Sequence, residues 1–391
     1  MLSLLIQENK SEDSLSPETT DSILEITGCG AWPGGRIVDN TMFERQGLFF
    51  KGAIPATDKT IRERIGVRTR RVAPPGERIG VTAFAELLES PDFDPSRIKV
   101  LINATNFGDT KYEVEPQVGP SFELVKSLCP QAMAFDLYAG CPGFNVSVEV
   151  ILMLTLSGYL KKGDISVIIG AENIHRARGF PESDTSNIIF GDDALATSLE
   201  SKADRTPQGS YTCRQTTDLP LGEDRVTAVA RAVLDLIGED DLDGLIVDNQ
   251  SPPLESRVPA IAARVQHRLV ELRHPRAVEA GVFERFKDAY AFYREHMNSF
   301  AYDINSLSGT PETVKDLAVS TVKSGKYKSV VSVFLGDDQT FEASLHQGRG
   351  YVFTRPKSGV VDAMTRTHGC FGDYIQGVRS GGDVYGEMDG K

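Results

Sequence analysis

The chain has 391 residues, 40% of them hydrophobic and 25% charged, with a formal net charge of −13 at pH 7. This composition is typical of a globular protein with a large core or two fused domains. The acidic balance argues against nucleic-acid binding, which needs a broad cationic surface. The apolar run at 148–160 is broken by polar residues, and the first residues lack the basic region and cleavage site of a signal peptide. We therefore expect a soluble cytoplasmic protein without membrane contact.

The cysteines predict neither a disulfide framework nor a zinc site, because they are odd in number and irregularly spaced. We expect free thiols at all five positions: Cys29, Cys129, Cys141, Cys213 and Cys370. No G-x-G-x-x-G run follows the first predicted strand, and no carboxylates and histidines cluster with the spacing of metal ligands. We expect no permanently bound cofactor and no metal.

The first half of the chain has the alternation of a parallel α/β sheet. Residues 1–22 are polar and predict a loose arm. Buried strands are expected at 22–32, 100–107, 132–140 and 164–172, with a long helix at 146–163. A pair of strands around a glycine turn is expected at 188–201.

The alternation restarts after a polar, turn-rich stretch at 201–223. Helices are predicted at 224–239, 256–269 and 313–327, and strands at 244–250 and 329–337. An inserted helical segment is expected at 270–302. The rhythm predicts an N-terminal half at 23–222, a C-terminal half at 223–350 and a Gly-rich extension at 351–391, although the halves share no visible sequence identity.

Cys141 is the principal candidate for a nucleophile. The segment FDLYAGCPGFN, residues 135–145, predicts a strand that turns tightly and places Cys141 at the start of a helix. Unpaired N–H groups and the positive end of the helix dipole would then favour the thiolate. Gly140 and Gly143 allow the sharp turn and the close approach of a substrate. A buried structural cysteine is the alternative, and the glycine-rich surroundings favour the nucleophile.

A basic segment at 59–71 stands out in the acidic chain. It contains Arg62, Arg64, Arg68, Arg70 and Arg71. These arginines could bind the phosphates of a ligand or an acidic helix of a partner protein. The residues alone equally allow a solvated loop whose arginines pair with nearby glutamates.

Five blocks together carry a resemblance to a known family: ITGCGAWPGGRIVDN, RERIGVRTRRVAPPGE, FDLYAGCPGFN, IIGAENIHR and NIIFGDDALATSLES. In this order they resemble the N-terminal half of ketoacyl synthase III-like proteins of the thiolase superfamily, over about residues 24–200. The resemblance implies a thiolase-like duplicated fold of five α-β-α-β-α layers, usually a homodimer, with Cys141 as the nucleophile. It also implies that the pantetheine arm and nucleotide of an acyl donor lie near Arg62, Arg64, Arg68 and Arg70.

The second half departs from this family at its catalytic partners. Relatives carry a histidine in an H-Q-A-N motif and an asparagine in a G-N-T-S motif. Asn249 falls at the histidine position, and Gly309, or in a shifted register Asn305 or Ser308, falls at the asparagine position. Asn249 can donate a hydrogen bond but cannot act as a base near neutral pH. Decarboxylation of malonyl groups is therefore expected to be weak.

Other residues enter as weaker candidates. His175 is the first candidate base and His296 the second, whereas His267, His274 and His346 are expected to be structural. His368 lies in the Gly-rich tail, which could fold back over a pocket. Gly336 falls where relatives have a loop beside the nucleophile, and it could lend a backbone contact. Asp192 and Asp193 more simply hold a turn.

Two functions follow from these residues. In the first, the protein is an acyltransferase or condensing enzyme. It takes an acyl group from acyl-CoA or acyl carrier protein onto Cys141 and passes it to a C, O, N or S nucleophile in fatty-acid-like or specialised-metabolite biosynthesis. In the second, it is a catalytically reduced scaffold subunit paired with an active ketosynthase-like partner. Retention of Cys141 favours the enzyme.

Overall fold

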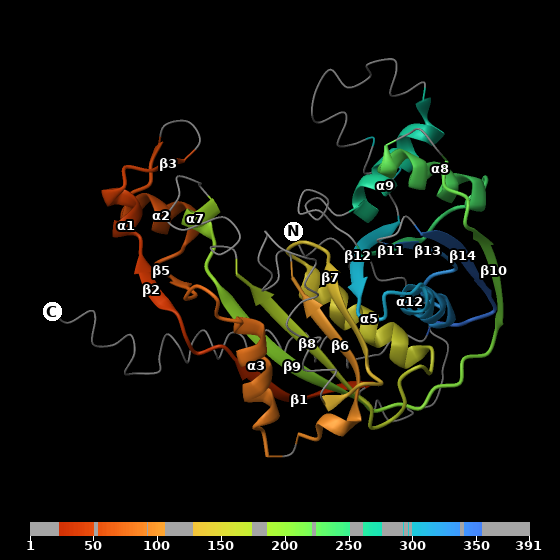
Figure 1. The fold of residues 1–391 in the computed structure, drawn as a ribbon, viewed down its shortest axis with the longest axis horizontal. Helices are drawn as coiled ribbons and strands as arrows, with labels where there is room; N and C mark the ends of the chain where they lie inside the picture. The colour runs from red at the N-terminus through yellow and green to blue at the C-terminus, as the bar shows by residue number, and fades with distance from the viewer. Residues whose placement is uncertain are drawn as a thin grey trace, which may run out of the picture.

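The computed structural model describes residues 23–50, 54–91, 93–105, 128–173, 186–220, 224–250, 261–275, 292, 296, 299–336 and 340–353. Ten of its strands form a single mixed sheet in the order β1-β9-β8-β6-β7-β12-β11-β13-β14-β10 (Figure 1). In chain order these strands are β1 (Leu24–Ala31), β6 (Ile98–Ala104), β7 (Met133–Tyr138), β8 (Ile165–Glu172), β9 (Asp193–Ser201), β10 (Ser210–Thr216), β11 (Gly244–Asn249), β12 (Phe300–Ser306), β13 (Ser329–Leu335) and β14 (Phe341–Arg349).

The sheet consists of two equivalent sets of five strands. Read outward from the middle, the first set runs β7-β6-β8-β9-β1 and the second runs β12-β11-β13-β14-β10. In the first set β6 pairs in parallel with β7 and β8, and in the second β11 pairs in parallel with β12 and β13. The two outermost pairs of each set are antiparallel. This shared topology shows the duplication that the sequence predicted from rhythm alone.

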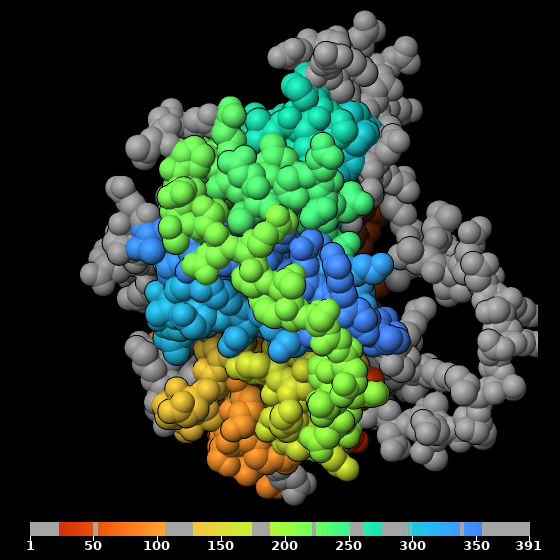
Figure 2. Space-filling view, turned by 90° about the vertical axis from the view of Figure 1, so that its right-hand side faces the viewer, coloured from red at the N-terminus to blue at the C-terminus, as the bar shows by residue number. Residues whose placement is uncertain are grey.

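Helices complete a five-layer arrangement around the two sets. Helices α5 (Gly143–Leu156) and α12 (Glu312–Lys323) pack against each other between them, α3 (Ile79–Leu88) covers the outer face of the first set, and α8 (Arg225–Ile237) and α9 (Ile261–Arg273) cover the outer face of the second (Figure 1). The expected α/β class and the thiolase-like layering are confirmed. In Figure 2 the second set, green to blue, lies above the orange and yellow residues of the first.

Strand periodicity explains how one sheet supports three cores. Successive side chains on a strand point to opposite faces. On β11, Ile246 belongs to the central core with α5 and α12, whereas Leu245 and Val247 belong to the outer core with α8 and α9. On β6, Ile102 belongs to the central core and Leu101 to the outer core with α3. These strands therefore read as continuous apolar runs, because both faces are buried.

A small lobe projects from the first set of strands (Figure 1). It contains α1 (Thr41–Arg45), α2 (Asp58–Ile65), α7 (Ser186–Ile189) and the short strand pairs β2 (Arg36–Asp39) with β5 (Thr69–Val72) and β3 (Phe49–Phe50) with β4 (Ile54–Pro55). Its own core is formed by Phe43, Ala56, Ile61 and Ile188. The arginine-rich segment thus runs through α2 and β5 of this lobe.

Several expected elements differ from the structure. The predicted strand pair at 188–201 is wrong in its first member, because Ile188 lies in α7 and packs into the core of the small lobe. Seven of the described strands were missed: β2, β3, β4 and β5 of the small lobe, β10 within the polar stretch at 201–223, β12 and β14. The expected helical insertion at 270–302 is also too wide, since α9 extends to Arg273 and β12 begins at Phe300.

Strand pairing also bears on the domain boundary. The expected N-terminal half ends at residue 222, but β10 pairs with β14 in the second set. Pairing therefore draws the boundary between Ser201 and Ser210, and the connecting chain crosses the face seen in Figure 2. The arm at 1–22 and most of the extension at 351–391 lie outside the described residues. Among the helices that the structure describes, none is long and apolar enough to cross a bilayer.

Candidate active site

Cys141 lies in the turn that joins β7 to α5. Strand β7 ends at Tyr138, and the helix begins at Gly143 after Pro142 as its N-cap. Gly140 has a φ of +66°, a left-handed conformation that favours glycine, and it closes the turn by accepting a hydrogen bond of 2.9 Å from the Gly143 N–H. The Cys141 side chain is exposed and its thiol is free. A small substrate can therefore reach the sulfur from solvent.

The beginning of α5 offers hydrogen-bond donors beside this thiol. No side chain caps the helix at Pro142. The N–H groups of a first helical turn have no partner within the helix, and the helix dipole places partial positive charge at the same point. An anion that develops next to Cys141 would meet these donors. The predicted placement of the thiol at a helix start is what the structure shows.

Asn249, which the sequence analysis placed at the histidine position of the family, makes no hydrogen bond to Cys141. It is the last residue of β11 and is 2% exposed. Within the described residues neither Nδ2 nor Oδ1 of its side chain has a hydrogen-bond partner. Asn305 lies beside it on β12, opposite Asp136 of β7.

The other residues expected near Cys141 form hydrogen bonds with neighbouring groups. The Gln250 side chain donates to Asp248 Oδ1 at 2.5 Å and lies near Gly309, whose φ is +62°. Ser308 bonds to Thr313 in the first turn of α12, at 3.0 Å between hydroxyl oxygens. The Gly336 N–H donates to Thr340 O at 2.8 Å, so its donor closes the β13–β14 connection.

The described histidines do not supply a base for Cys141. His175 and His368 lie outside the described residues. His296 Nδ1 bonds to Phe292 O at 2.9 Å, and its ring packs against that of His274. His346 is buried between the Tyr211 and Ser332 hydroxyls, at 2.7 and 2.8 Å, and burial lowers its pKa to about 4. His267, on α9, pairs with Glu271.

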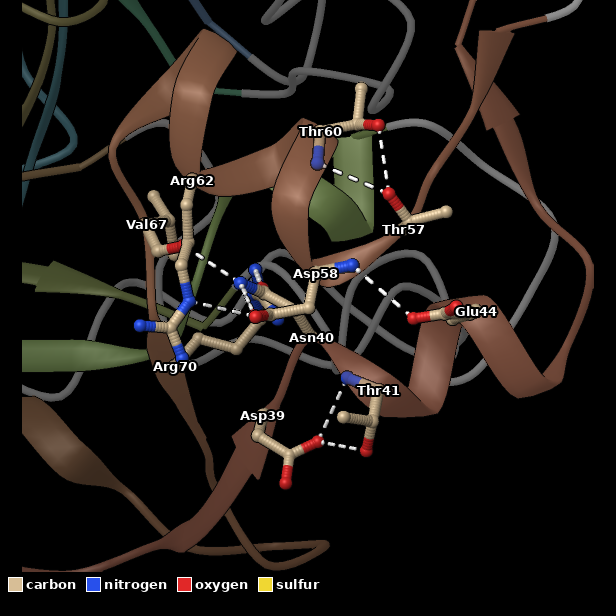
Figure 3. Close-up of polar contacts among 10 residues, drawn as sticks. All are labelled: Asp39, Asn40, Thr41, Glu44, Thr57, Asp58, Thr60, Arg62, Val67 and Arg70. Carbon is tan, nitrogen blue, oxygen red and sulfur yellow. Dashed lines mark hydrogen bonds and ion pairs between the residues drawn. The ribbon is translucent and has the colours of Figure 1, made fainter. Parts of the chain in front are cut away.

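The arginines of the basic segment divide into exposed and buried side chains. Arg62, Arg64 and Arg68 are exposed, and Arg62 forms an ion pair with Asp58 at 2.9 Å (Figure 3). Arg70 is 5% exposed. The exposed three can meet a ligand in solvent, and an anion site at these residues stays a prediction.

Arg70 stabilises the small lobe through buried contacts. Its Nη2 donates to Asn40 Oδ1 at 2.9 Å (Figure 3). The same nitrogen donates to Ile188 O at 2.8 Å, and the guanidinium lies 4.5 Å from the Phe43 ring centroid. Burial lowers the pKa of Arg70 to about 10. These contacts join α1, β5 and α7, so a structural role accounts for Arg70.

The aspartates after α7 also make structural contacts. Asp192 is buried and accepts a hydrogen bond from the Ala73 N–H at 2.8 Å, which ties the turn to the end of β5. Asp193 opens β9 and accepts from the Ala194 N–H, and burial raises its pKa. These contacts agree with the interpretation of FGDDALAT as a turn.

Three buried carboxyl groups on central strands were missed by sequence reasoning: Asp136, Asp248 and Asp303. Asp248 accepts hydrogen bonds from Ser306 and Gln250, and burial raises its pKa to about 6. Asp303 accepts from the Ile261 and Ala262 N–H groups at the start of α9, and burial raises its pKa to about 7. The only sequence signal was a carboxylate inside an otherwise apolar strand.

Layers, strand order and the strand–turn–helix around Cys141 define a thiolase-like α/β protein. Over 188 residues the chain is 30% identical to the beta-ketoacyl-[acyl-carrier-protein] synthase III of Prochlorococcus marinus, covering 46% of this chain and 50% of that protein. Over 183 residues it is 30% identical to the protein of the same name from Pectobacterium atrosepticum, covering 45% and 51%. The chain thus spans about half the length of the curated relatives it matches. No family model matches.

Solved structures of ketosynthases are also similar to the chain, at low sequence identity. The chain is 17% identical to the 3-oxoacyl-[acyl-carrier-protein] synthase III from Aquifex aeolicus, with 83% of this chain and 99% of that one covered and a TM-score of 0.37. It is 15% identical to the priming beta-ketosynthase of the R1128 polyketide pathway, with 88% and 100% covered and a TM-score of 0.36. The resemblance to ketoacyl synthase III-like proteins is confirmed by the curated relatives.

Proposed function

We propose that the protein is an acyltransferase or condensing enzyme of the ketoacyl synthase III type that carries its acyl group on Cys141. The observation that carries the proposal is the exposed thiol ahead of the uncapped N-terminus of α5. Sequence similarity to beta-ketoacyl-ACP synthases III supports the same reaction class. The donor would be acyl-CoA or acyl carrier protein, held by the exposed Arg62, Arg64 and Arg68, with no permanent cofactor.

The reaction has two steps. The Cys141 thiolate attacks the carbonyl carbon of the donor thioester, the new C–S bond forms, and the donor thiolate leaves and takes up a proton. N–H groups at the start of α5 stabilise the oxyanion of the tetrahedral intermediate. A second nucleophile then attacks the same carbon, releases its proton to solvent or a base, and expels the Cys141 thiolate.

Malonyl decarboxylation is proposed to be weak in this protein. The carbanion left by loss of carbon dioxide needs hydrogen-bond donors, which relatives supply from a histidine and an asparagine. Among the described residues, His267, His274, His296 and His346 all have other partners. Acyl loading needs only the thiol and backbone donors, so it is separable from condensation.

The test is intact-protein mass spectrometry after incubation with a panel of acyl-CoA and acyl carrier protein thioesters. We expect an acyl adduct on the unmodified protein and on Cys213→Ala, an exposed cysteine on β10 that serves as the matched control. We expect none on Cys141→Ala. An adduct that persists without Cys141 would refute the proposed nucleophile. Carbon dioxide release from malonyl thioesters as fast as acyl loading would refute weak decarboxylation.

A scaffold subunit is the second candidate, favoured by the lack of any hydrogen bond between Asn249 and Cys141. No adduct from any donor, with the protein folded, would support it. Co-purification with a ketosynthase-like partner would then distinguish a heteromer from the proposed homodimer.

A further inference from the structure

Backbone donors are scarce directly after Cys141 in the chain. Pro142 has no N–H group. The next N–H, that of Gly143, donates to Gly140 O at 2.9 Å and closes the turn. Two consecutive positions after the nucleophile therefore offer no N–H to an oxyanion that forms on the Cys141 thioester. A side-chain donor close to the thiol would add to the stabilisation by the remaining N–H groups of the turn and the helix start.

Asn145 carries the only polar side chain in the first turn of α5, residues 143–146. Its side chain is exposed, and among the described residues its amide makes no hydrogen bond. The next polar side chain of the helix is already engaged, because Ser147 Oγ donates to Gly143 O at 2.8 Å. Both N–H groups of the Asn145 amide can therefore serve a ligand.

Helix geometry directs the Asn145 amide toward Cys141. Pro142 has a φ of −82° and a ψ of 9°, close to helical values, and its carbonyl accepts the first bond of the helical ladder, from the Val146 N–H at 2.9 Å. Asn145 thus follows Cys141 by one helical turn, and residues four apart on such a path are neighbours on one face. Side chains of a helix lean toward its N-terminus and cover the preceding turn. The exposed amide is therefore directed toward the exposed thiol.

The charge around the turn suits an amide donor. The first turn of α5 contains no acidic residue that would oppose negative charge on the sulfur or on a substrate oxygen. An amide N–H donates without titrating, so it can act at any pH at which Cys141 reacts. Asn249 and Asn305 are each 2% exposed, whereas Asn145 and Cys141 are both exposed. A substrate that reaches the thiol from solvent can therefore also reach the Asn145 amide.

We propose that Asn145 is a catalytic residue of acyl loading: its Nδ2–H donates to the carbonyl oxygen of the donor thioester while Cys141 attacks the carbonyl carbon. This inference rests on the proposed acyl transfer to Cys141. The C–S bond forms, the carbonyl π electrons move onto oxygen, and the hydrogen bond from Asn145 strengthens as that oxygen becomes negative. Collapse of the intermediate expels the donor thiolate, and Asn145 keeps its proton throughout.

Two reactions of the same thiol separate this role from a structural one. Acylation of Cys141 builds negative charge on a carbonyl oxygen, whereas alkylation by iodoacetamide displaces iodide at a saturated carbon and forms no oxyanion there. In single-turnover assays at saturating acyl-CoA, read by peptide mass spectrometry, Asn145→Ala should acylate Cys141 at least about tenfold more slowly. An enclosed oxyanion donor contributes about 100- to 1,000-fold, and solvent reduces this for an exposed amide. Alkylation of Cys141 should keep its rate.

Further variants control for loss of an amide and for changes at the helix. Gln215→Ala removes an exposed amide from β10, at the far edge of the sheet, and should change neither rate. The Tm of Asn145→Ala should be unchanged or slightly higher, because alanine favours a helix. Asn145→Asp replaces the N–H donors by a carboxylate, so it should slow acylation further and shift the pH midpoint of Cys141 alkylation upward.

The outcomes distinguish this inference from the proposed function. Equal acylation rates in Asn145→Ala and the unmodified protein would overturn the inference and leave the proposed function intact. Parallel slowing of acylation and alkylation would assign Asn145 to the turn or to the thiolate, and would also overturn the inference. An unmodified protein that forms no acyl adduct would refute the proposed function and this inference with it.

Discussion

Asn305 lies directly opposite Asp136 on the antiparallel pair β7–β12, the single junction between the two sets of strands in the described sheet. Both side chains are 2% exposed. An apolar pair would be the simpler solution for a buried seam, because polar groups there need partners. The β7–β12 junction is thus polar on its outer face, while its inner face, with Phe135 and Ile304, is part of the central core.

Gly140 is expected to position the nucleophile. Its φ of +66° is disfavoured for other residues, so Gly140→Ala should cost about 1 kcal/mol of stability or more and displace Cys141. Gly47→Ala is a matched control, because Gly47 has a φ of +65° with open space around it. Both variants should lose similar stability by thermal unfolding, whereas only Gly140→Ala should slow Cys141 acylation. Equal acylation rates in the two variants would contradict this role.

His346 is expected to make the protein acid-sensitive. Burial lowers its pKa from 6.5 to about 4, so the folded state prefers the neutral ring. The unfolded chain binds the proton first, and stability from this group falls as pH drops from about 6.5 to about 4, by about 3 kcal/mol. The unfolding free energy of the unmodified protein, minus that of His346→Gln, should show this fall when both are measured across the same pH range.

The control for this experiment is His267→Gln, on the accessible surface of α9. The difference in unfolding free energy between the unmodified protein and that variant should not show the fall of about 3 kcal/mol expected for the buried His346. A parallel pH dependence in His346→Gln would show that the acid sensitivity comes from other groups.

Arg70 is expected to act on stability rather than on donor binding. Arg70→Ala removes the hydrogen bonds to Asn40 and Ile188 and the packing on Phe43, which should cost about 2–4 kcal/mol. Arg68→Ala, at an exposed position, should change stability by less than about 0.5 kcal/mol while weakening acyl-CoA binding. Denaturant unfolding and acyl-CoA titration separate the two effects. Normal stability with lost donor binding in Arg70→Ala would show instead that Arg70 contacts the ligand.

Asp224 is expected to stabilise α8 as its N-cap. Its Oδ1 accepts from the Val226 and Thr227 N–H groups, both at 3.1 Å, and hydrogen bonds from Thr227 lower its pKa. Asp224→Ala should therefore cost about 1 kcal/mol by denaturant unfolding at pH 7. Protonation of Asp224 weakens the cap, so the difference between the two proteins should shrink as pH falls. Asp218→Ala, exposed outside a helix, should have little effect.

The sequence by itself was sufficient for features that depend on a few consecutive residues. The run of Tyr138, Gly140, Cys141 and Gly143 predicted a strand, a tight turn and a helix start, because each step follows from local backbone preferences. Apolar runs likewise predicted β6, β7, β8, β11 and β13. Strand β10 was missed because its side chains are mostly exposed and polar, so only its pairing with β14 identifies it as a strand.

Only the tertiary structure decided which distant residues meet. Arg70 is buried because Ile188, 118 residues further along the chain, accepts its hydrogen bond, and no local pattern separates it from the exposed Arg68. Asn305 lies opposite Asp136, and Asn249 ends the next strand, through strand order and register, which depend on the packing of all five layers. Local backbone preferences thus determined the turn around Cys141, whereas long-range strand pairing determined which residues meet at the β7–β12 junction.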